Sequence, residues 1–244
     1  MGRAAALVGL LLVAGCASPR PPEIPAGGMP APPIAVGILL LDGVHGSALA
    51  APIDVFQHTV AHVEPHMRVF TVGRSFIPVT THEGLALRPK HDLEDAPAID
   101  VLVVPGGERG AAADLEDLAL VQWVARRGRD AKHVLALGNG AFLLAEAGLL
   151  RERQCTTHPG DMARFLEEYP HIPAVPDVSF VADHETITGA GGARSYEPAL
   201  YLVETLLGKP VAEAVARDLL IDWDLEKVPH RLVAPPAPAP AARN

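Results

Sequence analysis

The sequence HVLALGNGAFLLAEAGLL, residues 133–150, decides the fold. Residues 133–137 form a short apolar run, which predicts a strand covered on both faces. Residues 141–150 predict a helix, and only Gly138-Asn139-Gly140 separates it from the strand. The chain must therefore turn sharply at the carboxyl end of a strand, which is where open parallel sheets bind ligands.

Outward from this turn, short apolar runs alternate with segments of helical periodicity. We predict strands at 34–41, 67–72, 100–104, 178–182 and 186–188, helices at 47–63, 115–127, 195–207 and 210–220, and a hairpin-like stretch at 77–89. This alternation predicts an α/β fold in three layers, with helices on both faces of an open, mostly parallel sheet. A second glycine-rich exit, Pro105-Gly106-Gly107, follows the strand at 100–104. The two exits mark the expected pocket.

Composition narrows the class of protein. About half of the 244 residues are apolar, so the chain can build a sizeable core. The net charge is −9, with acidic and basic residues interspersed, which disfavours a nucleic-acid partner. Two cysteines are too few for a disulfide framework or a four-thiolate zinc site.

The N-terminal segment predicts export and lipidation. Residues 1–15 carry one arginine and a short apolar run, as a secretory signal peptide does. Residues 13–16, Val-Ala-Gly-Cys, resemble the bacterial lipobox, in which Cys16 is acylated with palmitate-type chains and holds the protein on a membrane. Ala17 favours the periplasmic face of the outer membrane. The alternative is an ordinary signal cleaved after Ala17 or Ser18.

Half of the 24 prolines lie near the two ends of the chain. We predict a proline-rich linker at 16–33, one folded domain at 34–228, and a Pro/Ala-rich tail at 229–244. Removal of these ends leaves Cys155 as the only thiol of the domain. The domain is therefore expected to lack an internal disulfide.

Five motifs resemble the ThiJ/PfpI family, also called DJ-one/PfpI, from residue 34 to about 223. They are GNGAFLLAEAGLL (138–150), CTTHPG (155–160), PGG (105–107), GVHGSALAAPIDVF (43–56) and SYEPALYLVETLLGK (195–209). The resemblance implies a flavodoxin-like sheet of the class I glutamine amidotransferase kind. By family habit it also implies a homodimer.

In this family a cysteine stands at the strand-to-helix bend, called the nucleophile elbow, and an acidic residue hydrogen-bonds its thiol. The helix N-terminus lowers the thiol pKa and backbone N–H groups face the developing oxyanion. The matching positions here are Gly138 and Ala48. Both halves of the pair are absent, which predicts a non-catalytic member of the family.

Several residues of the expected site remain. The resemblance makes His158 a general acid or base, although capping of the turn before Pro159 is an equal alternative. The amides of Gly106, Gly107, Asn139 and Gly140 form a nest for an anion or a carbonyl oxygen.

Two further side chains near the expected pocket each have two alternative roles. Asn139 either offers its side-chain amide to a ligand or only tolerates a tight turn. Arg194 either pairs with an anionic ligand or belongs to a helix start capped by Ser195.

Other cysteine, histidine and glycine patterns in the sequence do not predict a further functional site. Cys155, on a predicted strand, is expected to be a small buried thiol and not a replacement nucleophile. His58 and His62 have the i,i+4 spacing of metal ligands, with His66 close behind, but no Glu stands between them, so we expect no metal. The G-x-G-x-x-G pattern is absent, and no cofactor is expected.

Two functions therefore compete. The favoured one is a membrane-tethered, non-catalytic domain that binds a small ligand or a protein partner. The alternative is an isonitrile-hydratase-like or hydrolase-like enzyme that uses His158 and Asn139 around a bound water. We exclude a third, the sensor half of a transcription regulator, because an exported lipoprotein would not reach DNA.

Overall fold

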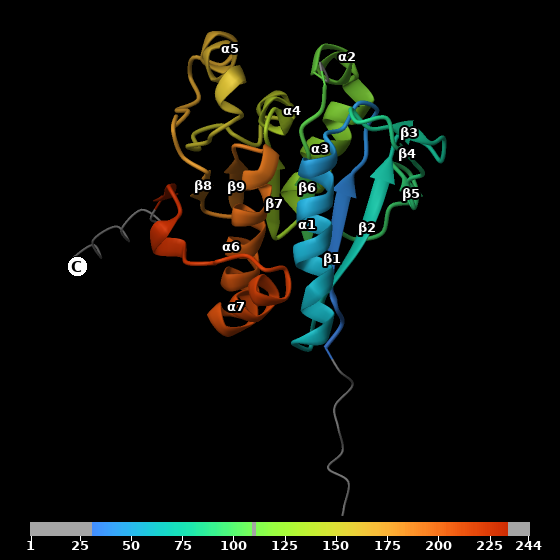
Figure 1. The fold of residues 1–244 in the computed structure, drawn as a ribbon. Coiled ribbons are helices and arrows are strands. Elements are labelled where there is room, and N and C mark those ends of the chain that lie inside the picture. Colours follow the sequence, from blue (N-terminus) through green and yellow to red (C-terminus); the bar gives the residue numbers. More distant parts are fainter. Residues whose placement is uncertain (1–30, 109–110, 234–244) are drawn as a thin grey trace, which may run out of the picture. The chain divides into compact units, whose positions relative to one another are not determined.

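The computed structural model describes residues 31–108 and 111–233, so the predicted signal peptide, Cys16 and most of the linker lie outside it (Figure 1). Its sheet has eight strands in the order β10-β8-β9-β7-β6-β1-β2-β5. All pairs are parallel except β8 with β9. The predicted open, mostly parallel sheet is confirmed.

The strands of the sheet are β1 Ile34–Leu39, β2 Met67–Gly73, β5 His91–Asp92, β6 Val101–Val104, β7 His133–Leu137, β8 Phe180–Asp183, β9 Thr186–Gly189 and β10 His230–Val233. A separate antiparallel pair joins β3 Val79–Thr80 to β4 Ala86–Leu87, where we predicted a hairpin. The helices are α1 Gly46–His58, α2 Ala111–Glu116, α3 Leu118–Asp130, α4 Gly140–Glu146, α5 Met162–Glu168, α6 Tyr196–Leu207 and α7 Lys209–Asp218. Short 3₁₀ turns are η1 Thr59–Ala61, η2 Pro159–Asp161, η3 Gly192–Ser195 and η4 Leu225–Lys227.

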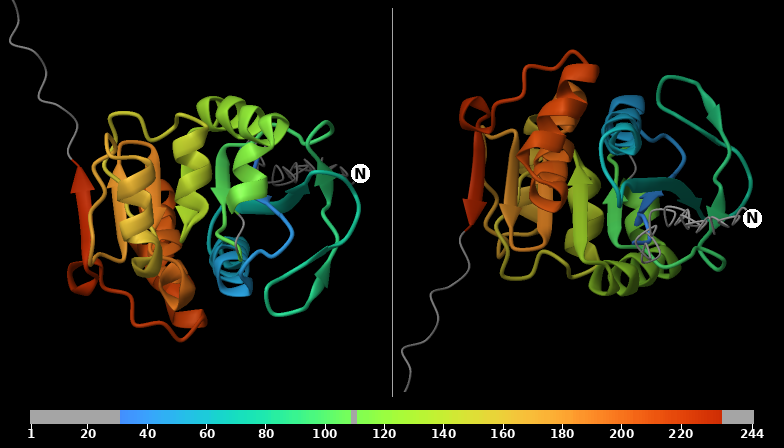
Figure 2. Two further views of the ribbon diagram at one scale, coloured as in Figure 1. Left: turned by 90° about the horizontal axis from the view of Figure 1, so that it is seen from above. Right: turned by 90° about the horizontal axis from the view of Figure 1, so that it is seen from below.

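Helices cover both faces of the sheet (Figure 2), and an apolar layer lies between each set of helices and the sheet. One layer packs α1, α6 and α7 on one face, and the other packs α3, α4 and α5 on the opposite face. In β6, Val101 and Val103 point into the first layer and Leu102 and Val104 into the second. Successive side chains of a strand point to opposite faces, so a strand buried on both faces must be apolar throughout.

Several boundaries differ from the prediction. The expected helix at 115–127 is two helices, because Asp117 accepts hydrogen bonds from the N–H groups of Ala119 and Leu120 and so caps α3. The helix expected at 141–150 ends at Glu146. Cys155 lies in no strand and makes only an isolated bridge with Ala174.

Three elements were not predicted: β5, α5 and β10. The last corrects the domain boundary, since residues assigned to the Pro/Ala tail pair in parallel with β8 from His230 to Val233. The folded part therefore extends past residue 228. Residues 234–244 are outside the described part. Within the described ranges, no helix has the length and apolar character needed to cross a membrane.

Candidate functional site

The predicted sharp turn between β7 and α4 centres on Gly138. Its φ is +57°, in the left-handed region that glycine adopts without steric cost. A Cβ built on Gly138 would have no neighbour closer than 3.9 Å, at the Ala190 carbonyl oxygen and the Gly191 Cα. The sharp bend of a nucleophile elbow is thus present. It has room for a side chain at position 138, but the residue there is glycine.

A cavity of about 190 Å³ opens at this bend, at the carboxyl ends of the parallel strands. It is lined by His45, Ala48, Gly106, Leu137, Gly138, Asn139, His158, Asp161, Gly191 and Gly192. We call it the elbow cavity. Ala48 from α1 and Gly138 from the turn face this one space, although 90 positions separate them in the chain.

The Asn139 side chain is occupied by the protein itself. Its Oδ1 accepts from the Gly107 N–H at 2.8 Å, and its Nδ2 donates to the Gly107 carbonyl at 2.7 Å. Its φ of −72° and ψ of 2° are not left-handed, so tolerance of such a turn does not explain the residue. Asn139 instead fixes the loop after β6 against the start of α4.

This clamp changes the expected nest of amides. The Gly107 N–H already has an acceptor, and neither Gly107 nor Gly140 lines the elbow cavity. Both line a second cavity of about 30 Å³, to whose lining Asn139 also contributes. Gly140 must be glycine, because an added Cβ would collide with the carbonyl oxygen of Val104.

His158 caps the turn η2. Its Nδ1 accepts from the Gly160 N–H at 3.2 Å and lies 3.9 Å from Asp161 Oδ2. Because Nδ1 accepts, the proton of the neutral ring is on Nε2. The ring lines the elbow cavity but is 55% exposed, so it is a solvated hydrogen-bond donor at the mouth.

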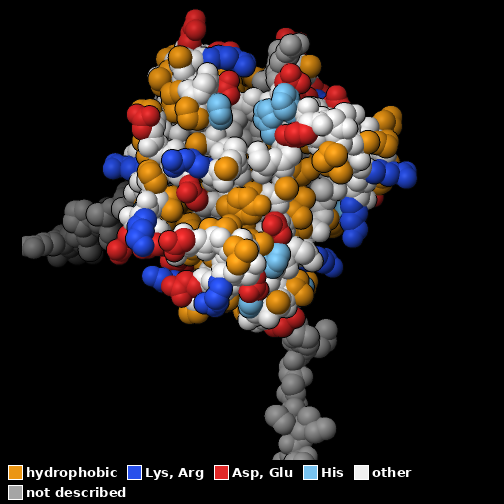
Figure 3. Space-filling model, viewed as in Figure 1, with side chains coloured by type: hydrophobic (Ala, Val, Ile, Leu, Met, Phe, Trp, Pro, Cys, Tyr) orange, Lys and Arg blue, Asp and Glu red, His pale blue; other side chains and the backbone are white. Residues whose placement is uncertain are grey.

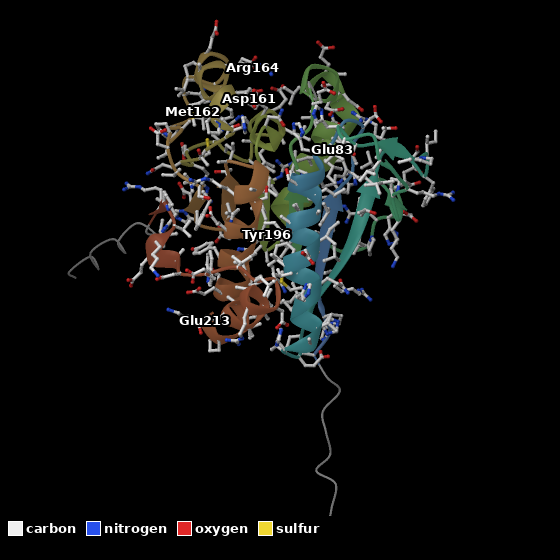
Figure 4. The ribbon with its side chains drawn as sticks, viewed as in Figure 1. Glu83, Asp161, Met162, Arg164, Tyr196 and Glu213 are labelled. Atoms are coloured by element: carbon white, nitrogen blue, oxygen red, sulfur yellow. The ribbon has the colours of Figure 1, made fainter. Side chains whose placement is uncertain are left out.

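His45 and Asp161 also line the cavity, and our sequence reasoning missed both. The His45 N–H donates to the Gly106 carbonyl at 3.0 Å, and its ring packs edge-on against His82 with centroids 4.8 Å apart. Glu83, beside His82, accepts from the Gly46 N–H at the start of α1 (Figure 4). The motif GVHG contained His45, but its orientation depends on how the hairpin packs against α1.

Arg194 is exposed and does not line the elbow cavity, so the structure does not bring it to the predicted site. Ser195 occupies the N-cap position of α6, but its side chain makes no capping hydrogen bond. Its Oγ is buried without a partner among the described residues. Burial raises the pKa of Glu197 in the first turn of α6, and the charge of Arg194 partly opposes this.

Cys155 is fully buried, and burial raises the pKa of its thiol to about 12. It does not line the elbow cavity. His58, His62 and His66 each contact a different acidic residue: Asp54, Asp218 and Glu64. Within residues 31–108 and 111–233, no three acidic, histidine or cysteine side chains are grouped to hold a metal ion.

Comparisons with known proteins identify relatives of the chain. An isonitrile hydratase from Pseudomonas putida is 31% identical over 185 residues, which cover 75% of this chain and 77% of that protein. The HTH-type transcriptional regulator GbdR of Pseudomonas aeruginosa is 26% identical over 206 residues. The match covers 82% of this chain and 54% of the regulator, so the chain spans about half of its length.

Solved structures share the fold. A THiJ/PfpI family protein from Pseudomonas syringae has a TM-score of 0.68 at 26% identity, over 87% of this chain and 83% of that chain. Drosophila melanogaster DJ-1beta, at 22% identity, has a TM-score of 0.68 over 78% of this chain and 100% of that chain. These neighbours confirm the flavodoxin-like, class I glutamine amidotransferase-like fold. The DJ-1/PfpI family model matches residues 35–205, and the chain therefore belongs to the DJ-1/PfpI family.

Proposed function

We propose that this protein is a membrane-tethered member of the family that binds a small ligand in its elbow cavity without covalent catalysis. The observation that carries the proposal is the pair Ala48 and Gly138. Both line one cavity, and neither has a side chain that can attack or transfer a proton. Covalent catalysis of the family's kind needs an activated nucleophile at position 138 and an acidic residue at position 48.

The Asn139 clamp removes one amide from the expected nest, because Gly107 lies outside the elbow cavity lining and its N–H is bonded. Stabilisation of an oxyanion needs N–H donors that are free when charge develops. The Gly107 N–H is already bonded to Asn139 Oδ1. What remains at the cavity is a recess of about 190 Å³ with His45, His158 and Asp161 around it, which suits a molecule of few heavy atoms.

The test uses a small alkyl isonitrile, whose hydration adds water to the terminal carbon and yields an N-alkylformamide. We expect the full chain to form no formamide above the buffer rate. We also expect ligand-observed NMR to show binding of the isonitrile that Ala48→Leu abolishes, because the new side chain fills the cavity. Ala50→Leu, on the exposed face of α1, is the matched control and should retain binding. Turnover by the wild type that disappears in His158→Ala would refute the non-catalytic assignment.

A second candidate is hydration by a water held at the cavity mouth. The 31% identity to an isonitrile hydratase and the Nε2–H of His158 at the cavity favour it. Asn139 would act here only by holding the Gly107 loop, since both ends of its side chain are bonded. Gly138→Cys separates the candidates: activity only in this variant supports a disabled elbow, and equal activity in both proteins supports the water mechanism.

The membrane attachment rests on residues 13–16 alone and is part of the proposal. Acylation of Cys16 predicts that the chain incorporates labelled palmitate in a bacterial host and sediments with the outer membrane. Cys16→Ser should abolish the label and release the protein from the membrane fraction. Unchanged sedimentation of Cys16→Ser would refute the anchor.

A further inference from the structure

The outer edge of β2, on the side away from β1, has no paired strand along the first half of β2. β5 pairs with β2 only at Val72 and Gly73. Both strands lie on the right of the sheet in Figure 1. The Ile34 N–H donates to the His66 carbonyl and the Leu40 N–H to the Val72 carbonyl, so β1 bonds to the even-numbered residues of β2. In a parallel strand the alternate residues bond to the opposite side. The backbone N–H of Val69 therefore points to the open edge.

A cavity of about 240 Å³ lies at this edge, lined by Arg68, Val69, Phe70, Lys90, His91 and Pro97. Three of these six side chains are basic. We call it the β2-edge cavity. Figure 3 shows basic side chains along the right-hand edge of the molecule, the side on which β2 and β5 lie in Figure 1. The cavity is separate from the elbow cavity and shares no residue with it.

Two of the three basic groups of this cavity have no carboxylate partner in the described part of the chain, whereas His91 Nδ1 lies 3.6 Å from Asp95 Oδ1. Arg68 and Lys90 have no carboxylate within 4 Å among residues 31–108 and 111–233. The His91 Nδ1 is buried and lacks a hydrogen-bond partner there. In a chain of net charge −9, the two unpaired cations Arg68 and Lys90 at one cavity are a local reversal of sign.

The nearby acidic groups are mostly engaged. Asp92 accepts from the N–H groups of Glu94 and Asp95, which help lower its pKa. Asp95 accepts from the Asp92 N–H, and its Oδ1 lies 3.6 Å from His91 Nδ1, beyond hydrogen-bond length. Asp92 ends β5 and Asp95 lies in the turn after it, whereas Arg68 and Val69 come from β2.

We propose that the β2-edge cavity binds a phosphate group, either as free phosphate or a phosphate monoester, or as the headgroup phosphate of a lipid. The guanidinium of Arg68 offers a planar pair of N–H donors, Lys90 adds a point charge, and the Val69 N–H adds a backbone donor. Ile34, where the chain enters the sheet from the linker, pairs with Met67 directly beside Arg68. A lipid headgroup beside the predicted membrane tether would offer the same phosphate group to these donors.

The test measures protection of Lys90 from acylation by an amine-reactive ester, read by mass spectrometry, with Lys209 of the same chain as internal reference. Lys209 is exposed on α7 and is outside the cavity. We expect phosphate to slow modification of Lys90 saturably while chloride at equal ionic strength does not. Arg68→Gln should weaken this protection about tenfold, the effect of losing one charge-assisted hydrogen bond. Arg126 is exposed on α3 and lies outside the cavity lining, so Arg126→Gln makes an equal change of charge and should leave the protection of Lys90 unchanged.

Vesicles distinguish the sources of the phosphate group. Protection of Lys90 by vesicles containing phosphatidylglycerol, but not by vesicles of phosphatidylcholine alone, would assign the site to an anionic headgroup. Protection by soluble phosphate without an effect of phosphatidylglycerol would assign it to a free ligand. The proposal is overturned if neither protects Lys90, if chloride protects it equally, or if Arg68→Gln behaves as Arg126→Gln does. None of these outcomes depends on catalysis at the elbow.

Discussion

Replacing Asn139 by alanine removes both hydrogen bonds that hold the loop after β6 to the start of α4. These bonds join the Asn139 amide to the N–H and the carbonyl of Gly107 at 2.8 and 2.7 Å. A protein hydrogen bond contributes roughly 1 kcal/mol net, so Asn139→Ala should lower the free energy of unfolding by about 2 kcal/mol. For a domain of this size the melting temperature should fall by about 4–8 °C.

Urea unfolding followed by circular dichroism measures this loss, and amide hydrogen exchange at Gly107 tests its cause. The Gly107 N–H should be protected in the wild type and exchange much faster in Asn139→Ala. Gln57→Ala, at an exposed position of α1, is the control and should change the free energy of unfolding by less than about 0.5 kcal/mol. Equal losses in the two variants, or an unprotected Gly107 in the wild type, would refute the clamp.

Three further predictions concern burial. Cys155 should resist alkylation at pH 8 in the folded chain and react quickly in urea, because a pKa of about 12 leaves almost no thiolate; rapid native labelling, read by mass spectrometry, would contradict this. Burial raises the pKa of Glu197 in the folded state above that in the unfolded state. Ionisation of Glu197 therefore favours the unfolded state, and its destabilising effect grows as the pH rises above the unfolded-state pKa. Glu197→Gln should therefore stabilise the fold more at pH 7 than at pH 4, and equal urea midpoint shifts at the two pH values would contradict this. Gly140→Ala should destabilise by about 1–3 kcal/mol through its collision with the Val104 carbonyl, whereas Gly148→Ala, in open space at positive φ, should cost less in the same urea assay.

Periodicity predicted the long elements because their burial is regular. β1, β6 and β7 are mostly apolar runs, β2 mixes buried and less buried residues, and α1 and α6 repeat apolar residues at helical spacing. The missed elements are short or polar. β5 has two residues, and β10 is ordered by pairing with β8 and not by burial of its own side chains. Local sequence carries little signal for a strand whose stability comes from its neighbour.

The candidate site was predictable only where a motif names its residue. The motifs identified Gly138 and Ala48 as positions without reactive side chains, and the fold places both on the elbow cavity. The role of Asn139 was not predictable, because its partner Gly107 lies 32 positions away. His45 and Asp161 were missed, and Arg194 was expected at the site and lies outside the cavity lining, because side-chain direction depends on the packing of loops.

The sequence by itself determined the family, the layered α/β class and the absence of the usual nucleophile, since each depends on residue identity at a motif position or on regular burial. Tertiary structure alone decided what the remaining polar groups do. It bonded Asn139 to Gly107 and gathered Arg68, Lys90 and His91 at the open edge of β2. The physical reason is that hydrogen bonds and charge clusters form between groups far apart in the chain, and only packing sets their distances.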